Sequence, residues 1–93
     1  MTWLDFHKDS EVAAARQDYA KAAELEEKAL RSIPRTKIRT FGIIAISAAW
    51  LWYKAGQHQE ALCVARSALD DQTLPPFARE ELEAVVVTVK RMC

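Results

Sequence analysis

The sequence has little of what marks a secreted, membrane-spanning or metal-binding protein. Its 93 residues contain only two cysteines, Cys63 and Cys93, and neither lies in a CxxC or Cys/His metal-ligand spacing. Two cysteines do not make a disulfide framework, so we expect a reducing, cytoplasmic setting, with Cys63 as a small core residue. The first ten residues include acids and no apolar core of signal-peptide length, so secretion is not indicated. The most apolar run, 41–53, is shorter than the roughly 20 residues that cross a bilayer, and it predicts a buried central helix without a membrane span.

An excess of one charge is also absent. Thirteen basic and thirteen acidic side chains cancel, so no global field attracts nucleic acid or an anionic membrane. One segment, 35–40, is locally basic through Arg35, Lys37 and Arg39. Two interpretations of it stay open: contact with an anionic partner, or a solvated loop. No aromatic residue alternates with these cations as in a single-strand binder, so we predict no nucleic-acid partner.

Glycine and proline are scarce, with two and three copies, while about half of the residues are apolar. This balance is typical of packed helices, and no linker divides the chain, so we predict one all-α domain over residues 1–93. Hydrophobic periodicity together with start and stop signals predicts five helices. Their expected ranges are 3 to about 16, 18–33, 38–55, 58–69, and from Pro75 or Pro76 to about 91.

Several residues mark the ends and faces of these helices. Thr2 is the expected N-cap of the first helix, Pro34 ends the second, and Gly56 closes the third. In the second helix, an apolar stripe is expected to face inward and four charged residues are expected to face water. The stripe is Ala22, Leu25, Ala29 and Ile33; the solvent-facing residues are Glu24, Glu26, Glu27 and Lys28.

Alanines seven residues apart recur in two stretches, and a proline follows each pair, five residues later in one stretch and seven in the other. Their positions are Ala22, Ala29 and Pro34 in one stretch, and Ala61, Ala68 and Pro75 in the other. Alanines seven residues apart lie two turns apart on one helix face, where they allow close approach of a neighbouring helix. The pattern therefore predicts a repeated helical hairpin.

These positions resemble the tetratricopeptide repeat. In the second hairpin, Ala49, Trp52, Gly56, Ala61 and Ala68 agree in type with the repeat pattern, whereas His58 and Ala65 stand where aromatic residues are usual. In the first hairpin, Tyr19, Ala22, Ala29 and Pro34 agree, and the turn glycine is missing. The resemblance implies hairpins at about 3–33 and 38–70, a capping helix at about 75–91, and a right-handed superhelix.

The resemblance also implies a function. Proteins of this family bind a peptide or a partner helix on the concave surface formed by the first helix of each hairpin. By resemblance, the partner-binding residues would be His7, Glu11, Ile46, Trp50, Tyr53 and Lys54. Trp and Tyr are enriched at binding hot spots. The alternative for Trp50 and Tyr53 is packing against the first or fifth helix.

A catalytic constellation is not evident. The histidines and Cys63 have no partner set that predicts a preorganised site, so we expect no enzyme activity, no cofactor and no metal. The competing function is assembly. Repeat arrays usually need about three units, and this chain has two and a cap. Trp3, Phe6 and the valine-rich last helix could therefore complete the core by pairing with a second copy as a homodimer.

Overall fold

The computed structural model describes residues 2–91, and within them the chain is entirely helical apart from turns and connectors. This confirms the predicted all-α class with five helices. Each predicted helix agrees with an observed one to within about two residues at either end. The helices are α1 (Trp3–Ala15), α2 (Tyr19–Ser32), α3 (Ile38–Lys54), α4 (His58–Leu69) and α5 (Pro76–Arg91).

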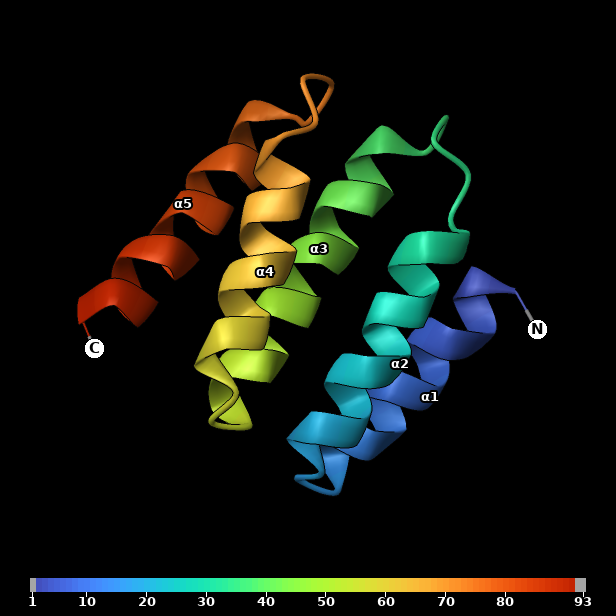
Figure 1. The fold of residues 1–93 in the computed structure, drawn as a ribbon. Helices are drawn as coiled ribbons and strands as arrows, with labels where there is room; N and C mark the ends of the chain where they lie inside the picture. Colours follow the sequence, from blue (N-terminus) through green and yellow to red (C-terminus); the bar gives the residue numbers. More distant parts are fainter. Residues whose placement is uncertain (1, 92–93) are drawn as a thin grey trace.

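Consecutive helices pack against one another, and α5 contacts both α3 and α4. Short turns make neighbouring helices antiparallel, with α2 in front of α1 and α4 in front of α3 in Figure 1. The start of α1 and the end of α5 lie on opposite sides of the molecule (Figure 1). The result is a slab of 36 × 31 × 16 Å, in which α3 occupies the centre.

The helix ends follow from local chemistry. Thr2 and Asp5 form a capping box, in which the Asp5 amide donates to the Thr2 hydroxyl oxygen and the Thr2 amide donates to the Asp5 carboxylate. The hydrogen bonds from the Thr2 amide and hydroxyl lower the pKa of Asp5. Gly56 takes a positive φ of 78° after α3, as expected of a C-terminal glycine. After α1 the same left-handed conformation falls on Gln17, with φ of 63°.

The core is centred on the apolar faces of α3, which is buried along much of its length. Ile44, Ala45, Ala48 and Ala49 have no exposed surface. Near its start, α3 approaches α5 so closely that a Cβ built on Gly42 would lie 2.8 Å from the Ala78 Cβ. Small residues thus set the distance between helices, as the alanine spacing predicts.

Two sequence-based expectations are wrong, and a third holds only in part: Glu27 is predicted to face water, but its side chain is 19% exposed and accepts a hydrogen bond from the Trp52 indole. Glu26 was expected to face water but is 1% exposed, because it continues the buried stripe of α2 between Ala22 and Ala29 and finds a polar partner on α1. Cys63 was expected in the core but its thiol is free and exposed, because it lies on the solvent side of α4. Cys93, the other cysteine, lies outside the described residues.

Candidate functional site

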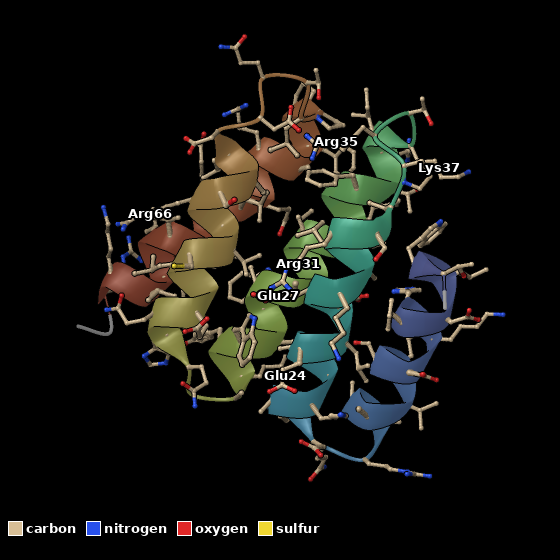
Figure 2. The ribbon with its side chains drawn as sticks, turned by 45° about the vertical axis from the view of Figure 1, so that its right-hand side comes forward. Glu24, Glu27, Arg31, Arg35, Lys37 and Arg66 are labelled. Atoms are coloured by element: carbon tan, nitrogen blue, oxygen red, sulfur yellow. The ribbon has the colours of Figure 1, made fainter. Side chains whose placement is uncertain are left out.

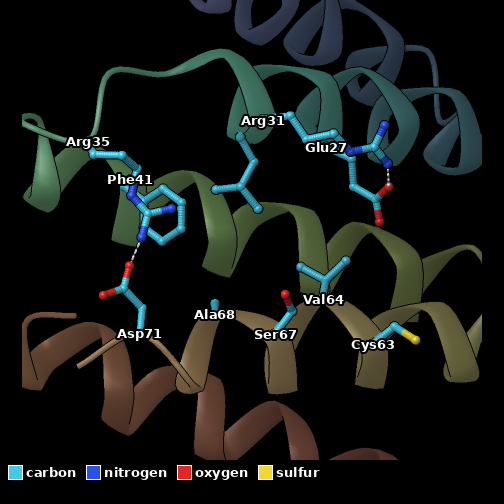
Figure 3. Close-up of a pocket in the computed structure, with 10 residues that line it drawn as sticks. Glu27, Arg31, Arg35, Phe41, Cys63, Val64, Ser67, Ala68 and Asp71 are labelled. Atoms are coloured by element: carbon cyan, nitrogen blue, oxygen red, sulfur yellow. Dashed lines mark hydrogen bonds and ion pairs between the residues drawn. The ribbon is translucent and has the colours of Figure 1, made fainter. Parts of the chain in front are cut away.

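A groove runs between α2 and α4, which both pack on α3. Its cavity measures about 450 Å³, and α3 contributes Phe41 to its lining. Figure 3 shows α2 and α4 as the two walls, with side chains from each directed toward the space between them. The lining residues are Glu27, Leu30, Arg31, Arg35, Phe41, Cys63, Val64, Ser67, Ala68 and Asp71. We call this the α2/α4 groove.

The floor of the α2/α4 groove is apolar. Phe41, Val64 and Ala68 are buried and Leu30 is half-buried. On α4, Val64 and Ala68 are one turn apart, so they point the same way. Ala68 and Ser67 are small, which leaves space that larger side chains would fill.

Charged residues form the rim. On the α2 wall, Arg31 Nη2 donates to Glu27 Oε2 at 3.0 Å, and Trp52 Nε1 donates to Glu27 Oε1 at 2.9 Å. At the other end, Arg35 forms an ion pair with Asp71 across the mouth of the groove (Figure 3). The Arg35 guanidinium also lies 4.3 Å from the centre of the Phe41 ring, a cation–π contact.

The structure separates the three cations that the sequence grouped as an anion-contact segment. Only Arg35 lines the groove. Lys37 is exposed at the start of α3 and points away from the groove (Figure 2). The Arg39 guanidinium lies 5.5 Å from the centre of the Phe77 ring on α5. The segment is therefore a connector followed by the first turn of α3, and its cations point in different directions.

The residues predicted on α3 from the repeat resemblance lie outside the α2/α4 groove. Trp50 and Tyr53 are half-buried and pack edge to face, with ring centres 5.5 Å apart. Tyr53 also stacks on His58, the first residue of α4, at 5.4 Å, and Lys54 lies 5.7 Å from the centre of the Tyr19 ring. Ile46 packs against the core as a half-buried residue. These aromatic rings therefore contact each other and α4.

His7 and Glu11 belong to a polar cluster at the α1–α2 interface. His7 Nε2 lies 2.9 Å from Glu11 Oε1, and His7 Nδ1 lies 2.8 Å from Glu26 Oε1. A neutral imidazole has only one N–H, so it can donate to only one of two ionised carboxylates. The cluster bridges two helices within the fold, and it gives His7 a structural task.

Sequence reasoning missed most of the groove. Glu27 and Arg31 are spaced i,i+4, a signal that marks an ion pair on a helix but does not reveal a groove. Ser67 and Asp71 gave no signal, because their role depends on how α2 and α4 sit on α3. Arg35 is the one predicted contact residue that lines the groove.

Comparisons with known proteins do not supply a family. No family model matches the chain, and neither does any curated protein or solved structure. The resemblance to the tetratricopeptide repeat stays a prediction from the residues. Within residues 2–91, no helix has both the length and the hydropathy needed to cross a bilayer.

Proposed function

We propose that this chain is a non-catalytic interaction module that binds a segment of another protein in the α2/α4 groove. The observation that supports this is an open cavity of about 450 Å³ with an apolar floor and a charged rim. Ligand sites typically measure about 300–1,000 Å³ and combine apolar lining with a few polar groups. A cavity of this size and composition suits one or two large apolar side chains inserted from a partner segment.

The α3 surface predicted from the repeat resemblance is the less favourable location. Trp50 and Tyr53 already contact each other, and Tyr53 stacks on His58. Hot-spot side chains have most effect when a partner fully desolvates them in a pocket. The α2/α4 groove offers a pocket, whereas the Trp50 and Tyr53 rings are half-buried against neighbouring side chains of the fold.

Self-association is the alternative function, and one observation favours it. Val12 is 52% exposed and lines a second hollow formed by α1 and α2, in which Phe6 and Leu25 lie beside charged residues. A second copy could cover its exposed apolar side chains. Light scattering separates the two functions, since a concentration-independent monomer would contradict the dimer and leave the groove proposal intact.

We place the module in the cytoplasm. Cys63 carries an exposed free thiol, and such a thiol persists more readily in a reducing compartment. The same thiol lines the groove and therefore reports on its occupancy.

The proposal is tested by blocking the groove. A random peptide library would be selected on the purified protein, and the enriched peptides synthesised and measured against variants. Ser67→Trp fills the groove from an exposed helical position, so we expect at least about tenfold weaker binding, equivalent to about 1.4 kcal/mol. Arg66→Trp is the matched control, because the adjacent Arg66 side chain points away from the groove (Figure 2).

Alkylation of Cys63 gives an independent measurement. A bound peptide should slow the reaction of Cys63 with iodoacetamide, followed by mass spectrometry, because Cys63 lines the groove. Selected peptides that bind Ser67→Trp as tightly as the original protein, and leave Cys63 unprotected, would contradict the proposal.

A further inference from the structure

The charges on the rim of the α2/α4 groove sum to zero, but the positive charges are more exposed to a ligand than the negative ones. Its charged residues are two arginines and two carboxylates. The side chains of Arg31 and Arg35 are 73% and 64% exposed, whereas those of Glu27 and Asp71 are 19% and 14% exposed. A molecule that approaches the groove therefore meets the cations first.

The carboxylate oxygens are already engaged by protein donors. Glu27 accepts from the Trp52 indole on one oxygen and from Arg31 on the other. Asp71 Oδ1 accepts from the Thr73 amide at 2.9 Å and from the Thr73 hydroxyl at 2.7 Å, and Oδ2 pairs with Arg35. Every oxygen of the two carboxylates thus already has a partner within the fold, and the low exposure of both side chains makes them less accessible to a cationic ligand than the arginines are to an anionic one.

The guanidinium groups retain donors. Each guanidinium has five N–H groups in a planar fork. Within residues 2–91, the recorded pairings of Arg31 and Arg35 use one terminal nitrogen each. The contact with Phe41 further fixes Arg35, so its remaining donors are held in place at the mouth of the groove. Donors that are already fixed lose less conformational entropy on binding.

We infer that the partner segment is acidic and amphipathic, with a large apolar side chain on the groove floor and carboxylates on Arg31 and Arg35. This inference rests on the proposed function and adds the chemistry of the partner. The apolar floor formed by Leu30, Val64 and Ala68 takes the side chain. Guanidinium groups bind carboxylates with two parallel N–H···O bonds, and this gives the segment its orientation.

The probe is a fluorescein-labelled peptide of alternating Leu, Phe and Glu, measured by fluorescence anisotropy. Two matched peptides accompany it: one with Lys in place of every Glu, and one with Ala in place of every Leu and Phe. We expect the acidic apolar peptide to bind at least about tenfold more tightly than either matched peptide. The preference for Glu over Lys should shrink as salt concentration rises, because the contacts lie at an exposed rim.

Charge variants assign the preference to the two arginines. Arg31→Gln with Arg35→Gln should abolish the preference for the acidic peptide, and Arg31→Glu with Arg35→Glu should reverse it. Arg66→Glu is the control, since it removes a cation from α4 that points away from the groove (Figure 2). It should keep the preference within about twofold of the original. Circular dichroism checks that each variant retains its helical content, and the Gln pair serves if the Glu pair fails to fold.

This inference would be overturned if the Glu and Lys peptides bound equally, or if the variant with both arginines changed to Gln kept the preference for the Glu peptide. It would also be overturned if the acidic peptide did not bind at concentrations up to about 1 mM. Tighter binding of an oligouridylate that competes for the same arginines would overturn it as well. If the Glu and Lys peptides bound equally and Ser67→Trp abolished the binding of both, only the preference for an acidic partner would be contradicted. The proposed function would stand in that case. Library peptides that bind the Ser67→Trp variant as tightly as the original protein would instead contradict the proposed function itself.

Discussion

The two hairpins bury different chemistry. Among residues 2–91, the two buried polar side chains, Ser10 and Glu26, both belong to the α1–α2 hairpin. Ser10 donates to the Ala22 carbonyl at 2.8 Å, and Glu26 contacts His7. The α3–α4 hairpin instead buries alanines and larger apolar residues, and its helix α3 makes one close glycine contact with α5. Loss of a buried polar partner should therefore destabilise the α1–α2 hairpin most, whereas substitution of a small residue by a larger one should destabilise α3 and its contacts most.

The largest expected effect follows from the loss of His7. His7→Ala leaves the Glu26 carboxylate buried without its partner, which we expect to lower the free energy of unfolding by about 3 kcal/mol. Urea denaturation followed by circular dichroism measures this change. Glu11→Ala is the matched control: Glu11 contacts the same ring but its side chain is 67% exposed, so its loss should cost less than about 1 kcal/mol.

The same cluster offers a stricter comparison. His7→Leu combined with Glu26→Leu removes both polar partners, so the double variant should be more stable than His7→Ala. If the double variant were as unstable as His7→Ala, the loss in the free energy of unfolding would come from packing volume and not from the loss of the His7–Glu26 pair. The polar character assigned to the first hairpin would then be wrong.

The next effect concerns the close contact of α3 with α5. In an unconstrained helix, Gly→Ala stabilises by about 1 kcal/mol. Gly42→Ala should instead destabilise by about 2 kcal/mol, because the new Cβ would lie 2.8 Å from the Ala78 Cβ. Thermal unfolding gives the sign directly. The double variant Gly42→Ala with Ala78→Gly should lose less free energy of unfolding than the two single variants lose in sum. A stabilised Gly42→Ala would contradict the close approach.

The helices were predictable because their signals are local. Thr2, Pro34 and Gly56 mark helix ends through backbone chemistry that acts within a few residues. The alanine spacing likewise indicated which faces are buried. The charge of Glu26 favours a solvent-facing position, but its place in the helix between Ala22 and Ala29 continues the buried stripe.

The groove was less predictable because its contacts join distant segments. Arg35 in the α2–α3 connector pairs with Asp71 in the α4–α5 connector, and the cavity depends on how far apart α2 and α4 lie on α3. No local pattern encodes that separation. The sequence did single out Arg35 as a contact residue, but it grouped Arg35 with Lys37 and Arg39, which the fold directs elsewhere.

The smallest expected effect compares the turns that close the two hairpins. Gln17 and Gly56 both take positive φ, which costs a residue with a Cβ about 1 kcal/mol or more. Gln17→Gly removes that cost, while the greater freedom of glycine in the unfolded chain offsets about half of the gain. We expect a net stabilisation of about 0.5 kcal/mol, seen as a rise in melting temperature of about 3 °C.

Gly56→Ala is the reciprocal change, and it isolates the backbone term because a Cβ at this position would meet no atom within 4 Å. We expect a loss of about 1 kcal/mol from strain alone. If Gln17→Gly lowered the melting temperature while Gly56→Ala also lowered it, the Gln17 side chain itself would stabilise the first turn. The two hairpins would then differ in their turns as well as in their buried chemistry, since only the second would depend on glycine.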